Sequence, residues 1–269
     1  MNMESASGRI ALHEAASSPS ATPELLKYLL NVYPESERLQ AVCKQDEHWR
    51  TVLHHAVTSC KHESIKTILD SLQESQRLQL VCIRDQKGNT ALHDAARSRN
   101  TGLVKTILNA LTESQGLQVA MISNARSETA LHHAAKSGNI ESIRAIMELY
   151  PESERIHAAC VRDQDRKCVL HWCVNALASC KDSLKALLDA IPESQHLQAV
   201  SMQDAHGDTV LHCVLSAGWA LKDIIVLLPE SQRLQALNLQ GRRGDTVLHL
   251  FNKGASIQSI MELIPTQQE

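Results

Sequence analysis

Aromatic side chains are scarce in this sequence. Phe, Trp and Tyr together make up 3% of its 269 residues. Proteins that bind single-stranded nucleic acid stack the bases on aromatic rings, so this composition weighs against that function. The formal net charge of -3 weighs in the same direction, because it gives the chain no general attraction for phosphate.

Long apolar runs and targeting signals are also lacking. No stretch reaches the ~18 apolar residues that indicate a membrane helix, and no basic start followed by an apolar run marks a secretory signal. The eight cysteines have no framework spacing, which is typical of a reducing compartment. We therefore expect no membrane partner and a cytoplasmic protein, with the host cytosol after secretion as an alternative location.

Motifs for catalysis are missing as well, since the sequence has no Gly-rich phosphate loop, nucleophile elbow or paired carboxylates. Cys168, His171 and Cys173 are the most suggestive cluster, because thiol and imidazole groups can form a nucleophile with its base or bind a metal. All three stand at positions that a repeat explains, so we expect no enzyme activity, no metal and no cofactor. A weak enzyme built on Cys173 and His171 stays an alternative, which fast labelling of Cys173 by a thiol probe would support.

What the chain does contain is a sevenfold repeat. Successive histidines of a Leu-His pair are 41, 39, 39, 39, 41 and 37 residues apart, a spacing typical of stacked repeats. Thr stands three residues before the His in five copies, where it is expected to cap a helix while the His ring reaches back to the cap. The pairs are Leu12-His13, Leu53-His54, Leu92-His93, Leu131-His132, Leu170-His171, Leu211-His212 and Leu248-His249.

Each copy continues with a second apolar pattern. Ile65, Ile68, Leu69 and Leu72 stand at i, i+3, i+4 and i+7, which predicts one buried helix face. No single copy can bury such a face alone, so neighbouring copies must stack. The last copy repeats the pattern at Ile257, Ile260, Met261 and Ile264, and Pro265 to Glu269 then ends the chain like a terminal cap.

A segment of the form P-E-S-x-R-L-Q follows the second helix. It begins at Pro34, Pro151, Pro192 and Pro229, and it predicts a short third helix with acid in its first turn. Our main interpretation is that this helix only lengthens the repeat. The alternative is that its exposed face forms a second docking ridge made of Glu35, Glu37, Arg38 and their equivalents.

The motif T-x-L-H-x-A-A, followed by S-G-N and an apolar helix, resembles the ankyrin repeat. The likeness is strongest over residues 128–139, which read E-T-A-L-H-H-A-A-K-S-G-N. It implies an all-α helical repeat solenoid of about seven stacked helix-turn-helix units, each with an added short third helix. Residues 1–7 would be a polar lead and residues 8–269 a single domain. The approximate units are 8–46, 47–85, 86–124, 125–163, 164–204, 205–240 and 241–265.

The resemblance also implies where a partner binds, because ankyrin repeats use the finger turns before the first helix and the concave side of that helix. In this chain those positions are mostly basic, which predicts a protein partner with an acidic surface or segment. Trp49 is the strongest candidate for a hot spot. The predicted binding residues are Arg9, His48, Trp49, Arg50, Lys87, Asn89, Arg97, Arg126, Glu128, Lys136, Arg166, Lys167, His206, Asp208, Arg242 and Arg243.

The sequence therefore predicts a monomeric, non-enzymatic scaffold for protein–protein interaction. Its divergent repeats also resemble those of ankyrin effectors that intracellular bacteria deliver into host cells, and binding a host protein is one alternative. Nucleic-acid binding through the basic turns is another, and a steep loss of binding with salt would favour it.

Overall fold

The computed structural model describes residue 5 and residues 7–174 and 180–250. These residues form nineteen α-helices and two short 3-10 helices, which confirms the all-α prediction. They belong to two compact units, unit 1 (Met1–Ala134) and unit 2 (Ala135–Glu269), with the boundary inside α10 (Ala130–Ser137). The single domain and its repeat limits stay predictions. The expected last helix at Ile257 to Ile264 and the cap after it lie outside the described residues.

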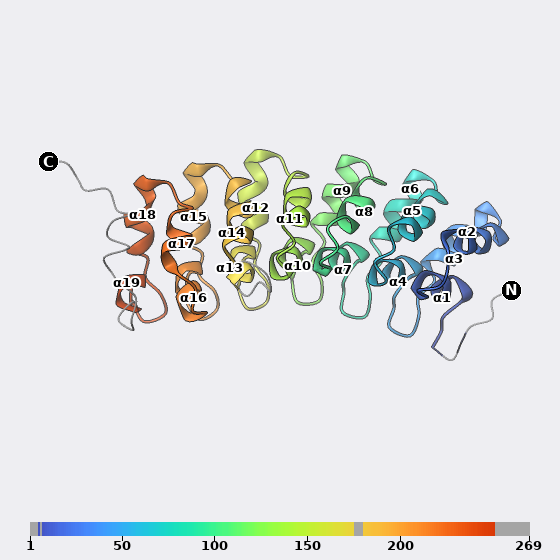
Figure 1. The fold of residues 1–269 in the computed structure, drawn as a ribbon, viewed down its shortest axis with the longest axis horizontal. Helices are drawn as coiled ribbons and strands as arrows, with labels where there is room; N and C mark the ends of the chain where they lie inside the picture. Colours follow the sequence, from blue (N-terminus) through green and yellow to red (C-terminus); the bar gives the residue numbers. More distant parts are fainter. Residues whose placement is uncertain (1–4, 6, 175–179, 251–269) are drawn as a thin grey trace. The chain divides into compact units, whose positions relative to one another are not determined.

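Unit 1 contains three complete repeats and the start of a fourth. First helices pack against first helices, second against second and third against third, so the repeats stack in layers (Figure 1). Ile65, Ile68, Leu69 and Leu72 are all buried, as the periodicity predicts. The helices that precede α10 are α1 (Ala11–Ser17), α2 (Pro23–Val32), α3 (Glu35–Cys43), α4 (Val52–Thr58), α5 (His62–Asp70), α6 (Glu74–Val81), α7 (Ala91–Arg97), α8 (Leu103–Leu108) and α9 (Glu113–Ala120).

Unit 2 follows the same plan. Its third helices begin with a 3-10 turn at two Pro-Glu-Ser segments, and the added third helix is thus present in both units. The elements are α11 (Ile140–Met147), η1 (Glu152–Glu154), α12 (Arg155–Cys160), α13 (Val169–Val174), α14 (Cys180–Asp189), η2 (Glu193–Gln195), α15 (His196–Val200), α16 (Val210–Ser216), α17 (Leu221–Ile225), α18 (Glu230–Leu237) and α19 (Val247–Leu250).

The repeat histidine joins one repeat to the next. In α7, His93 Nδ1 lies 3.1 Å from the backbone nitrogen of Thr90 and 2.9 Å from its hydroxyl, as the predicted cap requires. His93 Nε2 lies 3.1 Å from the carbonyl oxygen of Glu128 in the following turn. Because a carbonyl only accepts, Nε2 carries the proton and Nδ1 is the acceptor. His54 makes the same pair of contacts with Thr51 and with the carbonyl oxygen of Asn89.

The Arg that follows Glu-Ser in the segment after the second helix, with Gln73 in place of Pro in the second repeat, has a structural task that the sequence did not reveal. Arg77 Nε donates to the carbonyl oxygens of Leu69 and Leu72 at the end of α5, at 2.9 and 3.2 Å. Its Nη1 donates at 3.2 Å to Ala110 in the next repeat. Arg38 bridges its own second helix and the next in the same way, so its assignment to an exposed docking ridge is wrong. The fork of the guanidinium caps carbonyl groups that a helix end leaves without partners.

Replacing Arg77 with Ala is expected to cost about 2–3 kcal/mol of stability, because several half-buried carbonyl groups lose their donor. Lys at this position should recover little, since an ammonium group does not have the planar fork. Urea unfolding of both variants measures the effect. Arg99→Ala removes an exposed arginine and serves as the control, with an expected change within about 0.5 kcal/mol. Equal effects of Arg77→Ala and Arg99→Ala would contradict the bridge.

Candidate functional site

Each repeat begins with a finger turn of five residues that precedes the first helix. In residues 85–89, the nitrogen of Asp85 donates to the carbonyl of Asn89 at 2.7 Å, and Gly88 donates back to Asp85 at 2.9 Å. Gly88 has a φ of 78°, and a Cβ there would lie 2.6 Å from the nitrogen of Ala125 in the next turn. Glycine is thus required at this position both by the backbone angle and by the close approach of the neighbouring turn.

A side chain at the first position of the turn holds this backbone rigid. Asp85 Oδ1 accepts from the nitrogens of Lys87 and Asn89, at 2.9 and 2.8 Å. Asp46, Asn124 and Asp204 accept the equivalent pair in their own turns. The inward carboxyl or amide therefore fixes the turn, while the side chains between point outward.

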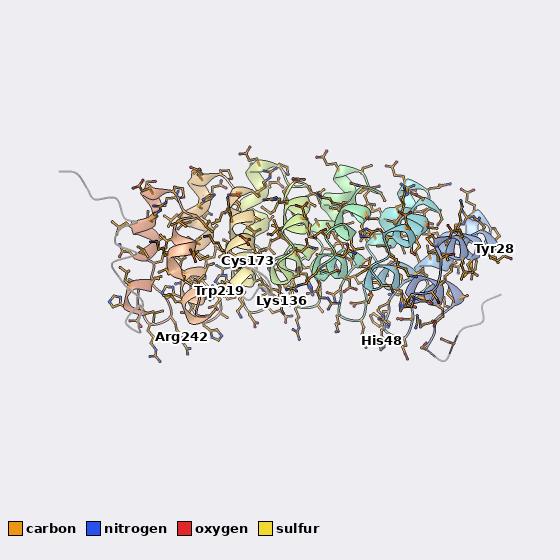
Figure 2. All side chains as sticks on the ribbon, viewed as in Figure 1. Tyr28, His48, Lys136, Cys173, Trp219 and Arg242 are labelled. Atoms are coloured by element: carbon orange, nitrogen blue, oxygen red, sulfur yellow. The ribbon has the colours of Figure 1, made fainter. Side chains whose placement is uncertain are left out.

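Neighbouring turns are also hydrogen-bonded to one another. In unit 1, Glu47 donates to Ser7, Gln86 to His48 and Ala125 to Lys87, all between backbone atoms at 3.0–3.1 Å. In unit 2, Ala205 donates to Asp165 at 2.8 Å. We call the exposed row of finger turns in each unit its finger ridge. Figure 2 shows His48 of unit 1 and Arg242 of unit 2 extending away from the helices of their own units.

The residue after the repeat histidine supports the turn from inside. His55 Nε2 lies 2.9 Å from Asp46 Oδ2, and Trp172 Nε1 donates at 2.8 Å to Asp163 Oδ2. Burial alone would raise the pKa of Asp46, but hydrogen bonds from Arg50, His55 and His48 outweigh it and lower the pKa to about 2. Burial lowers the pKa of His55 to about 4. In both pairs the two partners are nine residues apart in sequence. This constant spacing is the sequence signal from which the contacts could have been predicted.

The predicted binding residues fall into three groups by exposure. Ten side chains are exposed, four are half-buried and two are buried. Arg97 is exposed while it pairs with Asp94 at 2.8 Å, and Lys136 lies over the ring of Trp172 at 4.8 Å. The exposed residues are His48, Trp49, Lys87, Arg97, Arg126, Lys136, Arg166, His206, Arg242 and Arg243, the half-buried ones Arg9, Arg50, Lys167 and Asp208, and the buried ones Asn89 and Glu128.

Asn89 and Glu128 are corrections to the predicted contact set, because they are buried inside the turns. Asn124 Nδ2 donates to Asn89 Oδ1 at 2.9 Å and to Glu128 Oε2 at 2.7 Å. Burial would raise the pKa of Glu128, but hydrogen bonds from His133 and Asn124 prevail and lower it to about 2. Arg50 is likewise tied, through an ion pair of 3.1 Å with Asp46. These residues hold the turns in shape.

The exposed charged side chains of the ridge are more often basic than acidic, although Glu47 and Asp165 are also exposed. The acids at the first turn position, Asp46, Asp163 and Asp204, are buried and face inward. Lys87 and Arg126 in unit 1, and Arg166 in unit 2, are exposed. Each unit therefore presents basic groups on a hydrogen-bonded backbone, which attracts an acidic surface over a distance of about one Debye length, ~8–10 Å.

Trp49 occupies the turn position where four other copies have glycine and two have Ser127 and Arg166, which adopt the same positive φ. Its side chain is 58% exposed and its φ is 61°, in the left-handed region that a bulky residue rarely adopts. This conformation costs on the order of 1 kcal/mol, and a largely exposed indole returns little of that cost to the fold. Exposure in a strained conformation keeps Trp49 a candidate contact residue rather than a packing residue.

Trp49→Gly is expected to keep the fold as stable as the wild type or to stabilise it by up to about 1 kcal/mol, because glycine adopts this φ without strain. Trp49→Ala removes the same indole but keeps a Cβ in the left-handed region, so it should not gain this stability. Thermal unfolding of the two variants side by side measures the difference. If Trp49→Gly unfolds at a lower temperature than the wild type, the indole contributes to the fold.

The cluster of Cys168, His171 and Cys173 takes the place of the usual cap in α13. Cys168 Sγ lies 3.0 Å from His171 Nδ1, and His171 Nε2 lies 3.2 Å from the carbonyl oxygen of Asp208. Burial raises the pKa of the Cys168 thiol to about 12. The thiol therefore replaces the Thr hydroxyl as a neutral donor. Cys173 is fully buried, unlike the accessible thiolate that nucleophilic catalysis needs.

Within the ranges that the structure describes, no three His, Cys, Asp or Glu side chains are grouped so as to hold a metal ion. Among the helices of those same ranges, none is both long and apolar enough to cross a membrane.

Comparison with known proteins identifies the repeat. A family model described as "Ankyrin repeats (3 copies)" matches residues 12–115, and one described as "Ankyrin repeats (many copies)" matches residues 92–145. No curated protein sequence matches the chain. Among solved structures, the ankyrin repeat domain of Bcl-3, a member of the IkappaB family, is 18% identical with a TM-score of 0.69, covering 95% of this chain and 98% of that one.

A second solved structure, of the ankyrin repeat protein EF0377, is also 18% identical. Its TM-score is 0.60, and the match covers 81% of this chain and 95% of that chain. At this level of identity the two likenesses show the fold.

Proposed function

We propose that this chain, which belongs to the ankyrin repeat family, is a non-enzymatic scaffold that binds an acidic segment of a partner protein along its finger ridge. Ankyrin repeats are in general modules of protein–protein interaction. The observation that carries the proposal is the row of hydrogen-bonded turns in unit 1, which presents Trp49, Lys87 and Arg126 outward.

The composition of the ridge favours a protein over a nucleic acid as partner. An exposed Trp beside Arg and Lys is the side-chain set that hot spots of protein interfaces use. Buried acids lie directly beneath the basic groups, as Asp46 does beneath Arg50, and they reduce the attraction for a continuous run of phosphates. The ridge thus suits a partner that offers a few carboxylates and an apolar contact for the indole.

Affinity capture from a cell lysate tests this proposal. The bait is the whole chain, compared with a variant that combines Trp49→Gly, Lys87→Glu and Arg126→Glu. Captured proteins should fall at least about tenfold in the variant, since each change removes or reverses a contact on the ridge. Lys66→Glu, on the exposed side of α5, is the matched control and should capture the same proteins as the wild type.

Equal capture by the ridge variant and the wild type would overturn the assigned face. Nuclease treatment of the lysate separates the two classes of partner, because loss of binding after treatment would indicate a nucleic acid instead. The chain is further proposed to be monomeric and cytoplasmic. Delivery into a host cell as a bacterial effector stays an alternative that the divergent repeats alone support.

A further inference from the structure

Lys87 and Arg126 hold the same place in neighbouring finger turns of unit 1, and both side chains are exposed. Within the part of the chain that the structure describes, neither side chain has an ion pair or a hydrogen bond. By contrast, Arg50 and Arg97 are held by ion pairs within their own repeats. An ammonium group and a guanidinium group on adjacent turns therefore face solvent with their donors free.

The carboxylates beneath these two cations are already occupied. Asp85 Oδ1 accepts hydrogen bonds from two backbone nitrogens of its own turn, at 2.9 and 2.8 Å. Glu128 is buried, and its Oε2 accepts from Asn124 Nδ2 at 2.7 Å and lies 3.1 Å from His133 Nε2. Both acids serve the shape of the turns, so the cations above them are left for a carboxylate that comes from outside.

The preceding turn, residues 46–50, offers a different surface. Glu47 is its exposed acid and lies 3.9 Å from His48 Nε2, so this turn adds no net positive charge to the row. The indole of Trp49 is 58% exposed, and in the described part of the molecule its N–H has no acceptor. The exposed side-chain amide of Gln86, in the next turn, is equally without a partner there. The row thus runs from an apolar ring with a free donor to two unpaired cations.

Backbone hydrogen bonds hold the turns of this row at a regular spacing. The nitrogen of Gln86 donates to the carbonyl of His48 at 3.0 Å, and that of Ala125 donates to Lys87 at 3.1 Å. The first helices behind the turns pack together, as α4 does on α7. Because packed helices lie about 8–10 Å apart, equivalent positions in successive turns are roughly 9 Å apart.

Three regular peptide conformations can be compared with this spacing. In a polyproline II helix every third residue lies on the same side, about 9 Å apart. In a β-strand, residues three apart point to opposite faces. An α-helix matches the distance only with residues seven apart, at about 10.5 Å, and its backbone carbonyls are bonded internally. The polyproline II conformation fits the row best, because its unpaired carbonyls can also accept from the free indole and amide donors.

We propose that the finger ridge of unit 1 binds a segment in the polyproline II conformation with an acidic residue at every third position. Two successive carboxylates meet Lys87 and Arg126. A Pro one helical turn away packs on the indole of Trp49, in the way that aromatic side chains generally receive this conformation. This binding mode rests on the proposed function, and it adds the conformation and the register of the acidic segment.

A fluorescently labelled peptide of four Pro-Pro-Glu triplets, titrated with the whole chain at low ionic strength, tests this binding mode. A matched peptide has the same composition, but its glutamates are spaced alternately by two and four residues, so successive carboxylates point to different sides. The triplet peptide should bind at least about fivefold more tightly in fluorescence anisotropy, because only it brings two carboxylates to Lys87 and Arg126 together.

Variants of the ridge link this preference to the named side chains. Lys87→Gln and Arg126→Gln should each reduce the preference for the triplet peptide to less than about twofold, since a single cation gains nothing from the register. Trp49→Gly should weaken the binding of both peptides by about threefold or more, because both carry Pro. Lys66→Glu, on the exposed side of α5, is the control and should leave the preference unchanged.

Absence of binding, equal affinity for the two peptides, or a preference that survives in Lys87→Gln and Arg126→Gln would overturn this binding mode. Tighter binding of a helical, Ala-rich peptide with Glu at every seventh position would also overturn it and assign the ridge to a helix. If the ridge variant still loses its captured proteins from the lysate, such a result rejects the conformation and register alone. If capture is unchanged as well, the finger ridge itself is not the binding face.

Discussion

Lowering the pH from 7.5 to 5 is expected to cost the chain at least about 2 kcal/mol of its free energy of unfolding. The main cause is a group of repeat histidines, His54, His93 and His171 among them, which the fold buries in the neutral form. Burial lowers the pKa of His93 from 6.5 to about 3, and it also lowers the pKa of His54 and His171. Between pH 6.5 and the lowered value, the unfolded chain binds a proton that the folded chain does not bind, so acid favours unfolding.

Other groups extend this loss of stability to lower pH. The pKa values of Asp46 and Glu128 are about 2 in the fold, so their contribution is lost as the pH falls from about 4 to 2. Asp94 acts in the opposite direction, because burial raises its pKa and its protonation favours the fold. One such group does not compensate for the histidines, which begin to act at higher pH.

Urea unfolding at pH 7.5, 6.5, 5.5 and 5.0 measures this dependence. His93→Gln removes one buried titrating group, so the slope of unfolding free energy against pH should fall by about 1.4 kcal/mol per pH unit below pH 6.5. His157→Gln, at an exposed position, is the matched control. A wild-type stability that stays constant from pH 7.5 to 5.0 would show that the imidazoles are not held neutral.

The fold was predictable from the sequence because its signals recur with every repeat. The cap formed by Thr90 and His93 recurs in other repeats at a fixed spacing. The pattern is therefore recognisable even where one copy departs from it. The third helices were equally readable from the Pro-Glu-Ser segments. What the repeat pattern did not reveal is whether a polar side chain points into the protein or into solvent. Arg38 looks like a surface residue in the sequence, yet its guanidinium turns inward to carbonyl groups of two helices.

The finger ridge was only partly predictable for the same reason. Its outward positions were placed correctly by register, as at Lys87 and Arg126, whereas Asn89 and Glu128 were assigned to the surface although they are buried. Their direction depends on hydrogen-bond partners, Asn124 for both and His133 for Glu128, whose identity changes between repeats.

Asn124→Asp is expected to destabilise the chain by about 3 kcal/mol, although it introduces the residue that other finger turns carry at this position. Asn124 uses both ends of its amide. Oδ1 accepts from the nitrogens of Arg126 and Glu128, and Nδ2 donates to Asn89 Oδ1 and to Glu128 Oε2. Aspartate preserves the first pair of bonds, but it places a second carboxylate oxygen where Nδ2 now lies 2.7 Å from the carboxylate of Glu128.

A double-mutant cycle in urea isolates this repulsion from any general effect of the substitution. Glu128→Gln removes the opposing charge and supplies an amide donor, so the double variant with Asn124→Asp should recover most of the lost stability. Asp85→Asn is the matched control, because the Asp85 turn has Asn89 rather than a carboxylate at its fifth position, and its effect should be much smaller. Additive effects of Asn124→Asp and Glu128→Gln would show that the two side chains do not interact. Strong coupling would establish that in this turn the first residue must suit the buried carboxylate at the fifth position, and that the shape presenting Arg126 depends on this pair.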